Sequence, residues 1–133
     1  MTEVKPQDKL VLEAAQAAAA KKAKDIVILD VSKVFVITDH FLIASGNTER
    51  QVRTIADEIE RRLLETEKIK PARREGEREA RWVVLDYVDF IVHIFHTEDR
   101  EYYDLERLWS DARTVPFEEK WEGSDEPAAA EAT

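Results

Sequence analysis

The chain has 133 residues, 44% of them hydrophobic and 37% charged, with three glycines, four prolines and no cysteine. This length fits one domain with a modest core, and its dense apolar runs exclude a chain that is disordered throughout. No apolar stretch approaches the ~20 residues of a membrane-spanning helix, and the N-terminus lacks the features of a signal peptide. Without cysteine there is no disulfide, thiolate catalysis or cysteine-ligated zinc. We therefore expect a cytoplasmic protein without membrane contact.

The net charge is negative and unevenly distributed along the chain. Twenty Lys and Arg against 29 Asp and Glu give −9 at pH 7, which argues against strong binding to nucleic-acid phosphates. Residues 114–133 contain six acidic side chains and one lysine, so this tail alone carries −5. A basic protein, such as a ribosomal protein, is therefore a more natural partner than bare RNA.

The first half of the chain predicts two helices and two strands. An alanine-rich helix is expected over residues 8–24, with Asp8 as its N-cap. The apolar runs 26–31 and 41–45 predict buried strands. Thr48 and Gln51 have the spacing of a capping box at the start of the second helix. Five apolar side chains then recur at steps of three and four: Val52, Ile55, Ala56, Ile59 and Leu63.

The second half predicts a loop, a strand pair and a last helix. Residues 65–81 read as a long loop with a short edge strand. Residues 81–96 are too long for one strand and too β-branched for a helix, so we predict two strands joined by a tight turn over 86–89. Thr97 is expected to cap a helix that ends before Pro116. One face of that helix is expected to carry Tyr102, Leu105, Trp109 and Ala112.

This order of elements predicts an α/β fold in which helices pack against a small mixed β-sheet. We place the folded domain at residues 1–113 and expect residues 114–133 to form an acidic, disordered tail.

The sequence contains no pattern that is typical of a catalytic or metal site. Three separated glycines cannot form a phosphate-cradling loop, although the turn over 45–47 precedes a helix and has amides to offer an anion. Ser45 lacks the flanking residues of a nucleophile elbow. His93 shares a strand face with Asp89 but not with His96, and two ligands are too few for zinc. We expect no catalytic residue, no metal and no cofactor.

The segment 82–95 leaves two interpretations open. Asp86 and Asp89 form either a carboxylate pair for magnesium, as a nucleotidyltransferase-like enzyme would need, or a polar hairpin turn. The rings of Trp82, Tyr87 and Phe95 accompany these aspartates with no Lys or Arg between them. An aromatic and acidic surface of this kind suits docking on a basic protein, and burial in the core is the alternative for each ring.

Four segments in this order carry a family resemblance: AKDIVILDVS (23–32), TDHFLIASGNTERQVRTIADEI (38–59), WVVLDYVDFIVHIF (82–95) and REYYDLERLWSDA (100–112). The chain resembles the ribosomal silencing factor family, also called Iojap-like, over about residues 10–113, which leaves the acidic tail outside. His40 stands where the family has an aromatic residue, and Val88 stands where it has a glycine. A β-branched residue at position 88 disfavours a turn that needs positive φ.

The resemblance implies a nucleotidyltransferase-like α/β sandwich without an active site, and homodimers among the members. It implies a translational repressor that binds the large ribosomal subunit through its universal protein number fourteen and sterically blocks joining of the small subunit. A magnesium-dependent nucleotidyltransferase-like enzyme is the alternative. Carried over by position, the implied partner-binding residues are Trp82, Asp86, Tyr87, Asp89, His93 and Phe95.

Overall fold

A computed structural model describes residues 8–34 and 37–117 of the chain. In chain order the helices and strands are α1 (Lys9–Ala20), β1 (Lys24–Asp30), β2 (His40–Gly46), α2 (Glu49–Glu67), β3 (Arg73–Glu75), β4 (Trp82–Asp86), β5 (Phe90–His96), α3 (Thr97–Tyr103), α4 (Leu105–Leu108) and β6 (Arg113–Thr114). The strands form one sheet in the order β3-β4-β5-β2-β1-β6, in which β2 and β5 are parallel and all other neighbours antiparallel. The predicted mixed α/β architecture is confirmed. No helix in the described part of the chain has the length and apolarity that crossing a bilayer requires.

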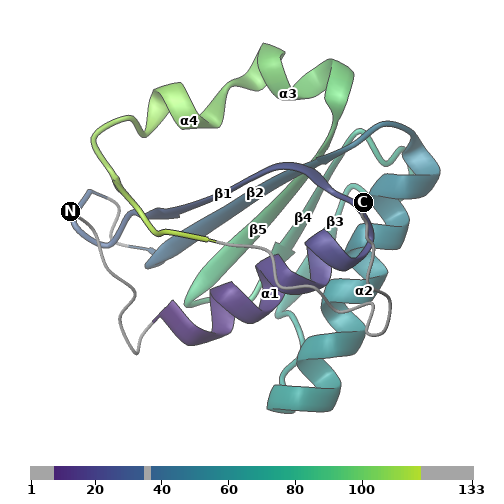
Figure 1. Cartoon of the computed structure of the whole chain (residues 1–133), viewed down its shortest axis with the longest axis horizontal. Helices are drawn as coiled ribbons and strands as arrows, with labels where there is room; N and C mark the ends of the chain where they lie inside the picture. The colour runs from purple at the N-terminus through teal and green to yellow at the C-terminus, as the bar shows by residue number, and fades with distance from the viewer. Residues whose placement is uncertain (1–7, 35–36, 118–133) are drawn as a thin grey trace, which may run out of the picture.

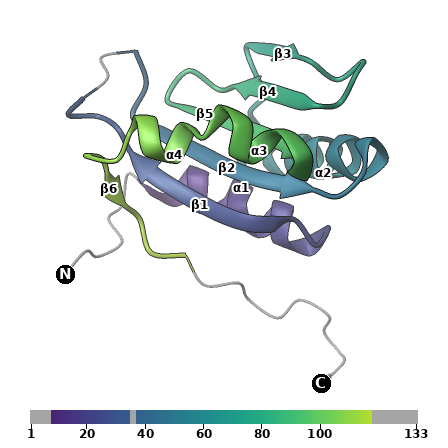
Figure 2. The same cartoon turned by 90° about the horizontal axis from the view of Figure 1, so that it is seen from above.

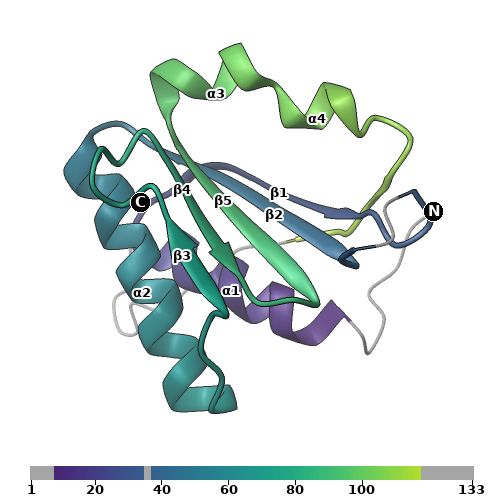
Figure 3. The same cartoon turned by 180° about the vertical axis from the view of Figure 1, so that it is seen from behind.

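The sheet separates two layers of helices. Helices α1 and α2 cover one face and bury the larger core, whereas α3 and α4 cross the other face (Figure 1). Seen from above, α3 and α4 lie over the middle of the sheet and leave β3 and β4 uncovered (Figure 2). The view from behind has β3, β4 and β5 in front, at the edge of the sheet away from β1 (Figure 3). We call the uncovered part on the α3–α4 side the open sheet face, formed by Arg73, Trp82, Val84, Asp86 and Ile91.

The second helix follows its sequence signals closely. The Oγ1 of Thr48 accepts a hydrogen bond from the amide of Gln51 over 3.0 Å, and the Gln51 side chain in turn accepts from the amide of Asn47 over 2.7 Å. This is a capping arrangement in which two otherwise orphan amides at the helix start find acceptors. All five side chains of the predicted apolar stripe are fully buried beneath α2.

Asp8 does not have the capping role that was predicted for it. Asp8 precedes α1, but its side chain makes no capping hydrogen bond to the helix. Its fully buried carboxylate instead lies 2.7 Å from Nε2 of His40 and 3.4 Å from the guanidinium of Arg113. A buried carboxylate needs such partners, and these come from β2 and β6, so local sequence gave no sign of them. The helix ends at Ala20, before the predicted residue 24.

The predicted single helix after β5 is broken in two. Its N-cap is His96, not Thr97, because Nδ1 of His96 accepts a hydrogen bond from the amide of Glu98 over 3.1 Å. Asp104 then adopts φ +45°, which ends α3 and starts α4. Tyr102 is 81% exposed, so the prediction that it shares one helix face with the other three residues is wrong. Three other predicted residues of that face do pack on the sheet: Leu105, Trp109 and Ala112.

The folded region extends past the predicted domain boundary at residue 113. Thr114 pairs with Leu29 in the sheet, and the amide of Val115 donates to the carbonyl of Ile28 over 2.9 Å. Val115 is buried and Phe117 packs against the core, so apolar burial holds these residues. Residues 118–133, which hold the rest of the predicted tail, lie outside the described residues.

Candidate functional site

An aromatic stack lies at the end of the open sheet face next to α3. Trp82 of β4 pairs with Phe95 of β5 in the sheet, and their rings stack with centroids 4.9 Å apart. Tyr103, at the end of α3, packs against Trp82 at 4.6 Å, and Tyr102 meets Tyr103 edge-on at 4.9 Å. Phe95 is fully buried, Trp82 is half-buried, and the two tyrosines are exposed. The stack therefore runs from the core outward to solvent, with Trp82 as its link.

His93 lies beneath this stack and fixes the position of Trp82. The indole Nε1 of Trp82 donates to Nδ1 of His93 over 3.1 Å, and the edge of the Phe41 ring contacts the imidazole at 4.9 Å. Burial lowers the pKa of His93 from its ordinary 6.5 to about 4, so the ring is neutral at pH 7. Because Nδ1 accepts, the proton is assigned to Nε2, which is buried and has no hydrogen-bond partner among the described residues.

The acidic residues lie at the end of β4 and in the turn that follows. The carboxylate of Asp86 accepts the amide of Val88 over 2.8 Å with one oxygen and pairs with Arg73 at 3.1 Å with the other. Asp89 is exposed at the other side of the turn. Arg73 thus offsets the charge of Asp86, and Asp89 adds an exposed carboxylate at this end of the open sheet face.

Tyr87 does not lie on this face. Side chains alternate along a strand, so the residue after Asp86 points to the α1–α2 side. There the Tyr87 ring stacks on Phe90 at 4.8 Å and is only 8% exposed. Burial raises the pKa of its hydroxyl, which has no hydrogen-bond partner among the described residues. The expectation that Tyr87 belongs to a contact surface is corrected by this position, because its ring is part of the core.

The structure thus divides the six predicted contact residues by face and depth. Trp82, Asp86, His93 and Phe95 share the open sheet face, but His93 and Phe95 are buried beneath it and serve as its foundation. Trp82, Asp86 and Asp89 keep exposed surface.

Sequence reasoning missed other residues of the same surface. Val84 lies between Trp82 and Asp86 on the same face, and the two-residue period of the strand was the signal that would have found it. Ile91 pairs with Asp86 across the strands and follows from the same period. No sequence signal pointed to Tyr103, which reaches Trp82 from α3, outside the sheet.

Val88 is a further correction. It was expected to disfavour a turn with positive φ, yet it adopts φ +75°. The hydrogen bonds of the surrounding turn hold it there, as described below.

Two of the groups considered for catalysis, Ser45 and Asp86, are engaged elsewhere. The Oγ of Ser45 is buried and accepts from the guanidinium of Arg100 over 2.6 Å. Asp86 is bound within the turn and to Arg73. Within residues 8–34 and 37–117, no group of three or more His, Asp or Glu side chains is arranged to hold a metal ion.

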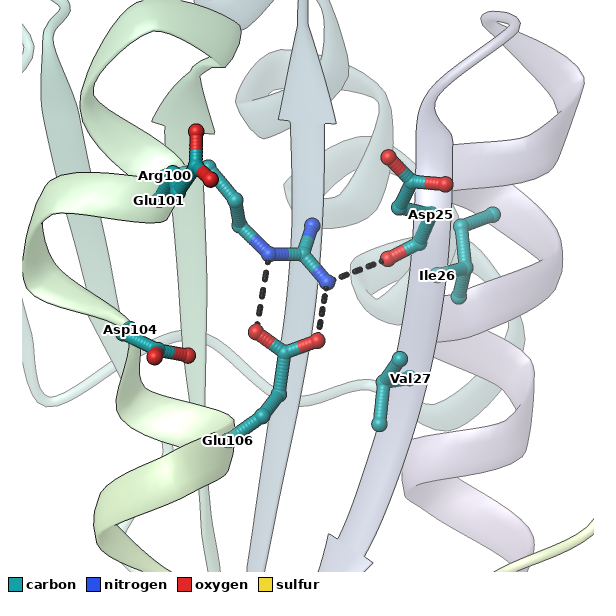
Figure 4. A pocket seen from close by; sticks show the side chains of 7 residues that line it. All are labelled: Asp25, Ile26, Val27, Arg100, Glu101, Asp104 and Glu106. Carbon is teal, nitrogen blue, oxygen red and sulfur yellow. Dashed lines mark hydrogen bonds and ion pairs between the residues drawn. The ribbon is translucent and has the colours of Figure 1, made fainter.

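A cavity of about 530 Å³ between β1 and the α3–α4 connection is lined by Asp25, Ile26, Val27, Arg100, Glu101, Asp104 and Glu106 (Figure 4). Its central feature is the guanidinium of Arg100, which bonds both carboxylate oxygens of Glu106, at 3.1 and 2.8 Å, and the carbonyl of Asp25 at 2.7 Å. Together with its bond to Ser45, these contacts tie α3 to β1 and β2. The geometry is that of a structural anchor which holds α3 beside the open sheet face.

Comparison with known proteins decides the family. The family model described as "Ribosomal silencing factor during starvation" matches residues 4–133. The chain belongs to the ribosomal silencing factor family. The match runs to residue 133, so it includes the acidic tail that we had left outside the resemblance. This is a family of ribosome-associated regulators of translation, not of known enzymes.

Named relatives and solved structures agree with this membership. The chain is 44% identical over 105 residues to the ribosomal silencing factor of Halalkalibacterium halodurans, which covers 79% of this chain and 89% of that one. It is 46% identical over 99 residues to that of Bacillus subtilis, covering 74% and 83%. A crystal structure of a Chromobacterium violaceum protein has a TM-score of 0.76 at 31% identity, covering 80% of this chain and 88% of that one.

A more distant relative is the mouse protein named "Mitochondrial assembly of ribosomal large subunit protein 1". It is 27% identical over 92 residues, which are 68% of this chain and 40% of the mouse protein.

Proposed function

We propose that this chain is a cytoplasmic translational repressor that binds the large ribosomal subunit through its universal protein number fourteen. Bound there, it sterically prevents the small subunit from joining. It acts without catalysis, metal or cofactor. The observation that carries the proposal is the open sheet face of a member of the ribosomal silencing factor family. Its partly exposed tryptophan is held from below by His93, and Asp86 and Asp89 lie at the end of the same face.

The aromatic stack supports a protein partner. A half-exposed tryptophan supplies large apolar area at little cost in conformational entropy, because its ring is already held by Phe95 and His93. Residues that dominate protein interfaces are typically such central, preorganised aromatic side chains. The neighbouring Val84 and Ile91 are partly buried and extend the apolar area on either side.

Charge supports a basic partner. The chain carries −9 overall, and the exposed Asp89 lies at the rim of the open sheet face. Complementary charge accelerates encounter and disfavours wrong partners more than it adds affinity. A basic ribosomal protein fits this distribution better than RNA does.

The large subunit is the favoured half of the ribosome because the mouse relative is named for assembly of that subunit. Steric exclusion requires only that the chain binds at the surface where the subunits join. A standard interface buries ~1,600 Å² in total, and a bound domain of 15.4 kDa on a subunit-joining surface needs only an affinity that competes with joining.

Direct binding tests the proposal. The purified chain is immobilised and titrated with large subunits, with small subunits, and with the isolated universal protein number fourteen. We expect saturable binding to the large subunit and to the isolated protein, and none to the small subunit. Absence of binding to the large subunit would contradict the proposal, and binding to the subunit but not to the isolated protein would reassign the partner.

A further inference from the structure

We propose that Val88 is a specificity-determining contact of this protein. The strained turn between β4 and β5 presents the Val88 side chain, beside the free carboxylates of Asp39 and Asp89, to an apolar depression bordered by Lys or Arg on the basic partner protein. This inference rests on the proposed function and extends its contact surface beyond the open sheet face.

The backbone of the turn holds Val88 in an unfavourable conformation. Its φ is +75°, and the amide of Asp89 donates to the carbonyl of Tyr87 over 2.9 Å, which makes Val88 the central residue of a γ-turn. A γ-turn with positive central φ is rare and strained, and a β-branched residue is among the least suited to it.

The surroundings over-determine this conformation. The amide of Val88 donates to the carboxylate of Asp86 over 2.8 Å, and its carbonyl accepts from Oγ1 of Thr38 over 2.9 Å. The next residues of the two segments are joined as well, because the amide of Asp39 donates to the carbonyl of Asp89 over 3.0 Å. Glycine would satisfy the same backbone bonds without strain, so the turn itself gives no reason for a valine.

The valine side chain does not contribute to the core. It is 59% exposed, and Ile37, which precedes Thr38 on the adjoining loop, is 69% exposed. Two large apolar side chains thus lie in solvent on two segments that hydrogen bonds join. Such exposure at a strained position is typical of a binding surface.

The charges beside this apolar tip select the partner. Asp39 and Asp89 are both exposed. They line a cavity of about 360 Å³ with Lys9 and Leu10 of α1, and no ion pair of either carboxylate is found among the described residues. Asp86, on the inner side of the turn, connects the tip directly to the open sheet face. An apolar knob beside two free carboxylates fits an apolar hollow with a basic rim, as a basic ribosomal protein would supply.

The test separates strain from binding with two glycine variants. Val88→Gly removes the side chain and relieves the left-handed backbone. Lys68→Gly is the matched control, because Lys68 is an exposed residue at φ +62° at the end of α2, on the opposite side of the sheet. Each variant is measured for thermal unfolding and for affinity to large ribosomal subunits, with the unaltered chain alongside.

We expect neither variant to unfold at a lower temperature than the unaltered chain, and only Val88→Gly to bind about tenfold more weakly. If Val88→Gly unfolds at a lower temperature, the affinity of Val88→Asn is used to test the inference instead. Asparagine tolerates positive φ, so this variant removes only the apolar contact. Unchanged affinity in Val88→Gly or in Val88→Asn, or equal loss in Lys68→Gly, overturns the inference while leaving the proposed function intact. A change in self-association instead of subunit binding overturns it in favour of a dimer contact. If the unaltered chain itself fails to bind, the proposed function falls and this inference with it.

Discussion

The indole N–H of Trp82 donates a hydrogen bond across neighbouring strands to Nδ1 of the buried His93, over 3.1 Å. The bond requires a neutral imidazole, and the low pKa of His93 provides one. It fixes the indole in the plane where Phe95 stacks on it. The proposed anchor of the interface is therefore oriented by His93, a buried residue beneath it.

Removal of the indole tests its role as anchor. We expect Trp82→Ala to weaken binding to the large subunit by ~2 kcal/mol or more, as truncation of central aromatic residues commonly does. The fold should survive, because Trp82 is only partly buried and packs against that core from outside. Leu108→Ala, at an exposed apolar residue of α4, is the control and should bind normally. Loss of folding in Trp82→Ala would show that the ring is a core residue.

Acid should destabilise the protein through His93. Its folded pKa of about 4 lies below the ordinary 6.5, so the unfolded chain binds a proton more readily. The associated stability is complete above pH 6.5 and is lost as pH falls from 6.5 to 4, by about 3 kcal/mol. Urea unfolding at several pH values measures this. His93→Gln should flatten the slope in that window, and an unchanged slope would contradict the assignment.

The anchor of α3 should be sensitive to loss of one arginine. Arg100 is 11% exposed and bonds Ser45, the Asp25 carbonyl and Glu106. Arg100→Ala leaves these groups unpaired, and we expect it to lower the free energy of unfolding by about 3 kcal/mol. Arg107→Ala, at an exposed position on α4, should change it by less than ~0.5 kcal/mol. Similar urea midpoints for the two variants would show that Arg100 is no anchor.

Tyr103 should support binding through Trp82. Its ring packs against the indole at 4.6 Å, so Tyr103→Ala should weaken subunit binding by about 1 kcal/mol, less than Trp82→Ala does. Tyr102 contacts Tyr103 and not the indole, and Tyr102→Ala should have the smaller effect. A larger loss for Tyr102 than for Tyr103 would show that the partner reaches the outer surface of α3 instead.

Local signals predicted much of this fold. The capping pair of Thr48 and Gln51, the apolar stripe of α2 and the strand pair in 81–96 each follow from residues within a few positions of one another. The role of Asp8 could not be predicted, because its partners His40 and Arg113 are 32 and 105 residues away. Whether a carboxylate is buried depends on tertiary contacts, and a local sequence pattern does not reveal these.

The sequence predicted which segment forms the candidate site, but not which side of the sheet each of its side chains points to. Tyr87 was assigned by its position in the family motif, and a motif does not say to which side of the sheet a side chain in the turn points. The positive φ of Val88 also depends on a contact outside its own segment. At Val88 a hydrogen bond from Thr38, 50 residues away, helps to outweigh the conformational preference of a β-branched residue.

Subunit joining gives the most direct test of the central claim. Large and small subunits are mixed at a magnesium concentration that permits joining, with the unaltered chain or with Trp82→Ala, and separated on a sucrose gradient. We predict that the unaltered chain travels with the free large subunit and depletes joined ribosomes, whereas Trp82→Ala does neither at the same concentration. Undiminished joining while the unaltered chain is bound to the large subunit would contradict steric exclusion.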